Sequence, residues 1–392
     1  MTSLPPYSPA VPAGLDPGAR LPTPRRPRVF AVLVWLLVIT VMLACGLLAL
    51  LAISEATGAL GFLTGLVLAA IPVFPVVAAF LWLDRYEAEP PSLLAFAFAW
   101  GAGVAALGAL VINTASVQAI RAAGGDPSRA ALGVAPLVEE TLKGLVILLI
   151  FLMRRREFDG VVDGIVYAGM VGVGFAFMEN TLYLGRAMAE GGTGATVLVF
   201  VVRCIVSPFA HPLFTAATGI GIGLAARSNK KWLWVVGPLA GWFVAVLLHS
   251  AWNLSAMSGL AGFVVAYAVF QLPIFVAFVA LALLARRREG RLIATHLHVY
   301  GTTGWLSPQE VAMLSSLSAR RDARGWAGRT GGKAGSQAMR DFQEMGSELA
   351  FLRERMVRGT APEDARTLES AMLARMSGLR AAFVPRWVTA TA

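Results

Sequence analysis

Long runs of apolar residues, interrupted only by short polar connections, occupy the chain from residue 29 to residue 285. A helix needs about 20 consecutive apolar residues to cross the hydrocarbon core of a bilayer. By this criterion the sequence predicts eight membrane-spanning helices, at residues 29–53, 59–83, 93–116, 132–153, 161–184, 196–226, 232–253 and 261–285. The sixth is the longest and contains Pro208 and Pro212, which predicts a kink or a tilt. The expected fold class is all-α, a polytopic membrane protein.

The two ends of the chain are polar. Residues 1–28 hold eight of the 21 prolines, which predicts a disordered tail. Residues 286–392 contain two sequences of the capping-box type, Ser307–Glu310 and Thr360–Glu363, with a glycine-rich break at residues 325–335 between them. We therefore expect a disordered proline-rich tail at 1–28, a transmembrane domain at 29–285 and a small helical tail at 286–392.

Composition and charge support this division. The chain is 57% hydrophobic and 14% charged, against about 45–50% and about 25% in soluble domains. A net charge of +10 is by itself typical of a nucleic-acid-binding protein. The charge is +3 over residues 1–28, zero over residues 29–285 and +7 over residues 286–392, so it lies entirely in the flanks. A neutral apolar centre with basic ends indicates a protein of the lipid bilayer, and we expect no nucleic-acid partner.

Basic residues in the short connections predict the orientation in the membrane. With eight spans, one side of the bilayer receives fifteen Lys and Arg residues and the other side receives three. Cytoplasmic connections carry the excess of Lys and Arg. We therefore predict a multi-pass protein with both termini in the cytoplasm.

Ionisable side chains inside the predicted spans are few and clustered. A charge at the centre of a bilayer costs about 2.5–3.5 kcal/mol on insertion scales, so such residues are usually functional. All of those well inside a span lie on four consecutive helices, the fourth to the seventh: Glu139, Glu140, Lys143, Glu179, Arg203, His211 and His249. A rise of about 1.5 Å per residue places Glu139, Glu179 and His249 within about 10 Å of the outer ends of their helices.

These residue types are suited to hydrolysis. Carboxylate and imidazole groups are the usual activators of water, and Glu and His are also ligands of zinc. Lys143 follows Glu139 by four positions and Glu140 by three, so it can neutralise part of the pair. The zinc-protease sequence HExxH does not occur.

The same residues also fit roles without hydrolysis. The Glu–Glu–Lys group can be a structural ion-pair cluster, and Glu179 with a histidine can form the proton relay of a transporter. Arg203 can extend toward the membrane surface, and Asn113 and Gln271 can form hydrogen bonds between helices. Asp163 is expected to cap the fifth helix. A further alternative is an inactive scaffold whose tail carries the function. Clustering on four adjacent helices favours an enzyme.

Four motifs resemble those of the PrsW family of bacterial intramembrane proteases. They are Glu139-Glu140-Thr-Leu-Lys143, Phe175-Ala-Phe-Met-Glu179-Asn180, His211 within Phe-Ala-His-Pro, and His249-Ser-Ala-Trp-Asn253. The segment Asp84–Pro90 resembles the DRYEPEP loop of that family, with Ala88 in place of a proline. The resemblance covers roughly residues 80–255.

The resemblance implies an endopeptidase of the bacterial cell membrane. Its substrate is expected to be a single-pass membrane protein, cleaved near the extracytoplasmic side, with an anti-sigma factor as the best-known example in the family. The related CAAX prenyl proteases have His at the position of Glu179, which argues against a prenylated substrate. A proton-coupled transporter remains the alternative.

We assign roles to the residues on this basis. Glu139 is the preferred base that activates water, and Glu140 shares or tunes its proton. His211 and His249 orient the water, bind a metal or donate protons, and Glu179 completes the site. The supporting residues are Lys143, Asn180 and Asn253, the last as a donor to the oxyanion. The ligands expected for a divalent metal such as zinc are Glu140, His211 and His249, and metal-dependent and metal-free mechanisms both remain open.

Overall fold

The computed structural model describes residues 29–155 and 158–383, and in these ranges it contains helices and no strand. The predicted disordered tail, residues 1–28, lies outside the described residues. The described chain divides into two compact units. We call residues 29–84 and 89–283 the membrane unit, and residues 85–88 and 284–383 the tail unit.

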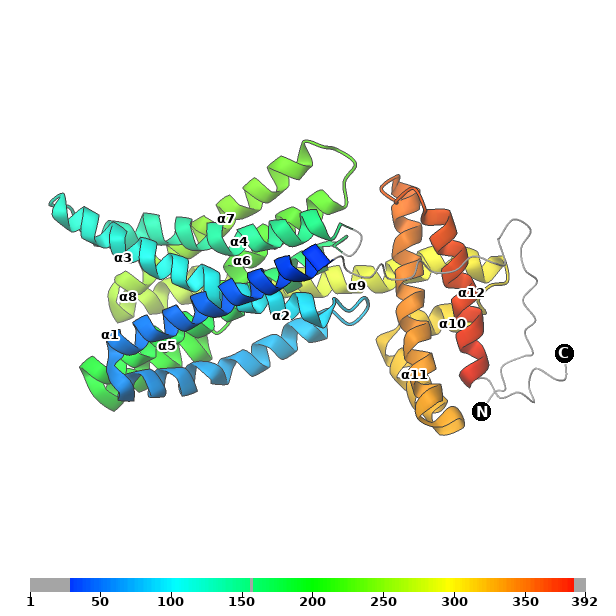
Figure 1. The fold of residues 1–392 in the computed structure, drawn as a ribbon, viewed down its shortest axis with the longest axis horizontal. Coiled ribbons are helices and arrows are strands. Elements are labelled where there is room, and N and C mark those ends of the chain that lie inside the picture. Colours follow the sequence, from blue (N-terminus) through cyan, green and yellow to red (C-terminus); the bar gives the residue numbers. More distant parts are fainter. Residues whose placement is uncertain (1–28, 156–157, 384–392) are drawn as a thin grey trace. The chain divides into compact units, whose positions relative to one another are not determined.

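The membrane unit consists of long α-helices (Figure 1), and short π-helical segments lie between some of them. A π-helical segment widens one turn of a helix and is frequent at functional sites. In chain order the elements are α1 (Val29–Leu83), α2 (Pro91–Trp100), η1 (Gly101–Ala105), α3 (Ala106–Ala122), η2 (Ala130–Val134), α4 (Ala135–Met153), α5 (Val161–Phe200), η3 (Val201–Val206), α6 (Ala210–Ala226), α7 (Leu233–Met257), α8 (Gly259–Ala266), η4 (Tyr267–Gln271) and α9 (Leu272–Thr302).

Five stretches of the described chain are long and apolar enough to cross a membrane: Val32–Leu83, Pro91–Ala122, Val161–Ala226, Leu233–Met257 and Gly259–Thr302. The chain is therefore an all-α protein of the membrane. Two of the stretches have a glycine with a positive φ angle in their interior, Gly58 at 67° and Gly192 at 64°, where helical geometry is interrupted. In Figure 1 the chain turns back within α1, as the predicted boundary between the first two spans requires. The total of eight spans stays a prediction.

The predicted kink in the sixth span is a complete break. Helical structure ends at Val206 and resumes at Ala210, so Ser207, Pro208 and Phe209 form a non-helical link between η3 and α6. Proline at 208 has no N–H to donate and cannot continue a helical hydrogen-bond ladder. His211 lies in the first turn of α6, directly after the break.

Helix α5 is the centre of the membrane unit and is buried along most of residues 161–181. It packs against α1, α2 and α6. At Gly172 a Cβ atom would lie 2.7 Å from the backbone of Pro212, so only glycine permits this approach of α5 to α6. Small residues allow helices in a membrane to pack closely in this way. The contact brings the start of α6, with His211, against α5.

Three buried carboxylates gather around the segment between α1 and α2. Asp84 accepts a hydrogen bond from the backbone N–H of Glu89 (2.8 Å), and Glu89 accepts one from the hydroxyl of Tyr167 (2.5 Å). Asp163 accepts from the backbone N–H of Gly160 (2.8 Å). Gly160 is the N-cap of α5, so the prediction for Asp163 is corrected: it caps the helix from its third position. Burial raises the pKa of Asp84 to about 8, and burial followed by the charge of Asp163 raises the pKa of Glu89 to about 10.

These carboxylates predict that stability falls as the pH rises. A free glutamate has a pKa of about 4.3, so folded Glu89 holds a proton that the unfolded chain has lost. This stabilisation is complete below pH 4 and disappears as the pH approaches 10. We expect Glu89→Gln, which has no proton to lose, to raise the melting temperature at pH 9 by several degrees over the unchanged chain, because 1 kcal/mol is worth about 2–4 °C in a domain of this size.

The measurement is thermal unfolding in detergent micelles at pH 5, 7 and 9. The control is Glu190→Gln, since Glu190 is exposed. If Glu89→Gln and the unchanged chain lose the same stability between pH 5 and pH 9, the conclusion that folded Glu89 is protonated is wrong.

The tail unit has its own hydrophobic core. Its helices are the end of α9, α10 (Pro308–Leu314), α11 (Leu317–Arg358) and α12 (Ala365–Phe383), which enclose buried side chains such as Phe342 and Leu349. The capping box at Ser307 and Glu310 is present at the start of α10. The predicted capping box at Thr360–Glu363 is wrong, because α12 begins only at Ala365. The glycine-rich break is present but shorter than predicted: Gly332 has a φ angle of 61° and interrupts helical geometry, whereas the rest of residues 325–335 is helical.

Candidate active site

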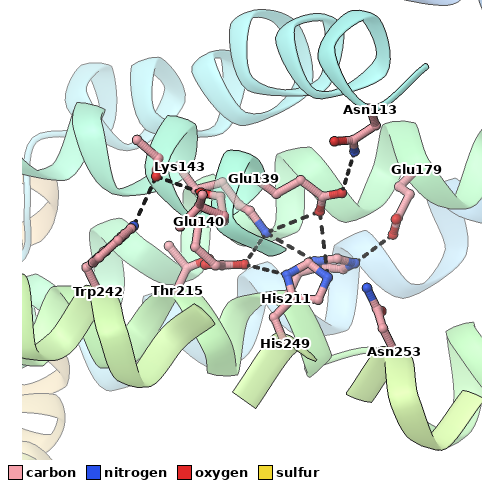
Figure 2. Close-up of polar contacts among 12 residues, drawn as sticks. Asn113, Glu139, Glu140, Lys143, Glu179, His211, Thr215, Trp242, His249 and Asn253 are labelled. Carbon is pink, nitrogen blue, oxygen red and sulfur yellow. Dashed lines mark hydrogen bonds and ion pairs between the residues drawn. The ribbon is translucent and has the colours of Figure 1, made fainter. Parts of the chain in front are cut away.

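Helix α4 supplies three ionisable side chains to the interior of the membrane unit (Figure 2). Glu139, Glu140 and Lys143 are all buried, and Glu140 and Lys143 have no exposed surface. Positions 139, 140 and 143 share one face of a helix of 3.6 residues per turn. The clustering expected from the sequence is therefore present in the tertiary structure.

Glu140 has hydrogen-bond partners at both carboxylate oxygens. Its Oε1 accepts from Nζ of Lys143 (2.5 Å) and lies 2.9 Å from Nδ1 of His249. Its Oε2 accepts from the hydroxyl of Thr215 (3.0 Å), one turn after His211 on α6. Glu140 thus neutralises the buried lysine and orients the ring of His249, with Nε2 of that ring directed toward Glu139.

Glu139 has one satisfied oxygen and one oxygen without a partner. The amide of Asn113, on α3, donates to Oε1 (3.1 Å). Oε2 is buried and, among the described residues, has no hydrogen-bond partner. It lies 3.7 Å from Nε2 of His249 and 3.9 Å from Nζ of Lys143. Buried polar atoms are nearly always paired, so an unpaired carboxylate oxygen marks a position for a water molecule or a cation.

A second carboxylate–histidine pair lies opposite. Nε2 of His211 is 2.6 Å from Oε2 of Glu179, and the guanidinium of Arg203, from η3, also donates to that oxygen. Nε of Arg203 donates to the side-chain oxygen of Asn180 (2.7 Å). The alternative that Arg203 extends toward the membrane surface is therefore wrong, since its charge is used against Glu179.

Aromatic rings form the walls around both imidazoles. The rings of His211 and His249 lie 5.1 Å apart and nearly perpendicular. Phe214 stacks on His249 at 5.1 Å, and Phe175 lies 5.2 Å from His211. Nζ of Lys143 lies 4.2 Å above the ring of Phe175, a cation–π contact. These rings restrict the imidazoles to one orientation.

Three residues offer ligand atoms for a divalent cation, and a cation at Nδ1 of His211 would take the place of Nζ of Lys143, which lies 3.2 Å from that nitrogen. Glu139, His211 and His249 each offer a ligand atom, all within 4.8 Å of one another. A histidine that binds a metal usually donates its other N–H to a carboxylate, and Glu140 and Glu179 stand in that position for His249 and His211. The ligand expected from the sequence was Glu140. In the structure Glu139 lies with the two histidines instead, because both carboxylate oxygens of Glu140 already contact Lys143, His249 and Thr215.

The structure adds three residues to the site and pairs a further one, Asn253, with a backbone carbonyl. Asn113, Thr215 and Phe214 contact Glu139, Glu140 and His249; the four-residue spacing of His211 and Thr215 on one helix was the available signal. The amide of Asn253 donates to the carbonyl of Ala131 (2.8 Å), which ties α7 to η2. Its role at the oxyanion stays a prediction.

Comparison with known proteins identifies related sequences. A family described as "PrsW family intramembrane metalloprotease" matches residues 89–281. Relatives named "Protease PrsW" include one from Geobacillus kaustophilus, 32% identical over 46% of this chain and 75% of the relative. Another, from Bacillus subtilis, is 27% identical over 51% of this chain and 86% of the relative. A third, from Clostridioides difficile, is 26% identical over 48% of this chain and 78% of the relative. No solved structure matches the chain.

Proposed function

This chain belongs to the PrsW family of intramembrane proteases, and we propose that Glu139, His211 and His249 form its hydrolytic centre. The observation that carries the proposal is the buried, unpaired Oε2 of Glu139 beside Nε2 of His249. A water molecule there has a base on one side and an imidazole on the other. The proposed substrate is a single-pass membrane protein, cleaved near its extracytoplasmic side.

The side chains of this protein have distinct tasks in that reaction. Asn113 holds one oxygen of Glu139, so the other is presented to the water. Glu139 takes the proton of the attacking water and returns it to the leaving amine nitrogen. Glu140 and Glu179 hold the two imidazoles in place, and Lys143 keeps Glu140 ionised and bound.

A divalent cation would be held by Glu139, His211 and His249. When bound, it would polarise the scissile carbonyl and activate the water. The aromatic walls and the two carboxylate–histidine pairs serve both mechanisms, because each needs fixed imidazoles in a dry site.

The family resemblance and the charge pattern support a substrate and a topology. The excess of Lys and Arg on one side supports cytoplasmic termini, and the positions of Glu139, Glu179 and His249 along their helices support access from the opposite side. We propose an anti-sigma factor as the substrate, in regulated intramembrane proteolysis.

The test is cleavage of a single-pass reporter by purified protein in liposomes. We expect His249→Ala to reduce the cleavage rate by about 100-fold or more, the usual contribution of a positioned acid–base group. The matched control is His298→Ala, an exposed histidine, with an unchanged rate. A chelator separates the two mechanisms: loss of activity that added zinc restores indicates a metal enzyme.

Two results would contradict the proposal. One is a His249→Ala rate within a few-fold of the unchanged protein. The other is proton-coupled flux across the liposome membrane with no proteolysis, which would identify a transporter.

A further inference from the structure

An apolar cavity of about 420 Å³ lies in the membrane unit and is partly open to the protein surface, where Phe270 and Leu254 of its lining are exposed. Its walls come from the break before α6, from the second half of α7, and from η4 with the start of α9. Most of its surface is aliphatic or aromatic, including Leu213, Phe214, Leu248, Trp252, Phe270 and Phe275. For scale, an apolar cavity of about 150 Å³ in another protein binds benzene. This cavity has room for one or two large apolar side chains.

The cavity adjoins the candidate active site. A second, small hollow is lined by His211, Asn180 and Arg203, which surround Glu179. Four residues line both spaces: Ser207, Pro208, Ala210 and Trp252. Phe214, which stacks on His249, also lines the larger cavity. The ring of Phe214 therefore separates an object in the cavity from His249, and the four shared residues separate it from the hollow beside His211.

The break at Ser207–Phe209 forms part of the shared wall. Non-helical backbone at membrane depth occurs only where it is buried in protein or lines a cavity. A helical substrate shields each carbonyl with its own hydrogen bonds, so the scissile segment has to be extended when it reaches the site. The side chains beside the scissile bond then project to the sides, and those of a membrane segment are apolar.

One polar group on the cavity wall distinguishes a peptide from a lipid. Gln271 donates from Nε2 to the hydroxyl of Ser255 (2.5 Å), which joins η4 to α7 as expected for a hydrogen bond between helices. Its Oε1 is buried and has no hydrogen-bond partner within the described part of the chain. A backbone N–H of a peptide segment can supply the missing donor, whereas an acyl chain has none.

We propose that this cavity binds the large apolar side chain of a substrate residue next to the scissile bond and so determines which bond is cut. The proposal rests on the proteolytic function proposed above. A pocket that fits one apolar side chain discriminates against a smaller one by about 10–200-fold per missing methylene group. The preference for a large apolar side chain therefore depends on the residues that line the cavity. Substitutions there can change it without changing the hydrolytic residues.

The test narrows the cavity from a wall that the small hollow does not share. Ala266 lines the cavity and does not line the hollow beside His211. Ala268 lies two residues further on, is exposed and is not part of the lining. Ala266→Phe is the test variant and Ala268→Phe is its matched control. Two single-pass reporters are used, whose mapped cleavage site is flanked by Phe in one and by Ala in the other.

We expect the unchanged protein and Ala268→Phe to cleave the Phe reporter at least about 10-fold faster than the Ala reporter. Ala266→Phe should lose most of this ratio while its rate on the Ala reporter stays within a few-fold. An unchanged ratio in Ala266→Phe, or an equal loss on both reporters, would overturn the proposal.

A second measurement does not depend on cleavage. A photo-reactive benzoylphenylalanine at position 270, which lines the cavity, should crosslink to the Phe reporter in vesicles. Crosslinks to lipid alone, with the reporter present in excess, would assign the cavity to an acyl chain and overturn the proposal. If no reporter is cleaved but this crosslink forms, the proposed function fails and the peptide-binding cavity stands.

Discussion

Glu139→Gln is expected to reduce reporter cleavage by about 100- to 10,000-fold, the range of a general base. Gln has nearly the same shape as Glu, and its carbonyl oxygen can still accept the hydrogen bond from Asn113. The second oxygen, which has no hydrogen-bond partner among the described residues, is replaced by an amide NH2 group that neither takes a proton nor binds a cation. The loss therefore falls on the chemical step, and the melting temperature should stay within about 2 °C of the unchanged protein or rise.

The measurement is the initial cleavage rate in liposomes, paired with thermal unfolding of the same preparation. Glu190→Gln makes the same change at an exposed position and should leave both values unchanged. Full activity in Glu139→Gln would assign the reaction to another carboxylate, with Glu179 as the next candidate because it contacts His211.

Lys143→Met is expected to have the second large effect, on stability. Lys143 and Glu140 have no exposed surface and their charged atoms are 2.5 Å apart. Met keeps the length of the side chain but leaves Glu140 without its cation. Removal of one partner from a buried ion pair typically costs about 3–5 kcal/mol, because the other charge stays buried and uncompensated.

A double substitution separates the charge from the packing. Lys143→Met with Glu140→Gln removes both charges, and we expect it to recover most of the lost stability without restoring cleavage. Arg353→Met is the matched control, since Arg353 pairs with Glu369 while 34% of its side chain is exposed, and such pairs contribute about 0–1 kcal/mol. Unfolding titrations in mixed micelles measure the free energy of unfolding of the single, double and control variants. A Lys143→Met protein as stable as the unchanged chain would contradict the buried pair.

The sequence by itself determined the class of protein and the set of ionisable groups that cluster in its interior. Membrane helices follow from the length of apolar runs, which is a local property. The clustering of Glu139, Glu179, His211 and His249 followed from the same runs, because each ionisable residue inside them is costly and stands out. Helix caps were less predictable, since α12 begins at Ala365 and not at the capping sequence Thr360–Glu363.

Only the tertiary structure decided which of two adjacent glutamates is free. Glu139 and Glu140 are neighbours in sequence, but successive side chains on a helix point about 100° apart and so meet different helices. Glu140 meets Thr215 and His249 and is fully bonded, whereas Glu139 keeps one oxygen open. The same cause applies to three other findings: the direction of Arg203, the apolar cavity beside α6, and the replacement of Glu140 by Glu139 among the metal-binding candidates. They depend on distances between helices, which close packing sets and residue spacing along one helix does not contain.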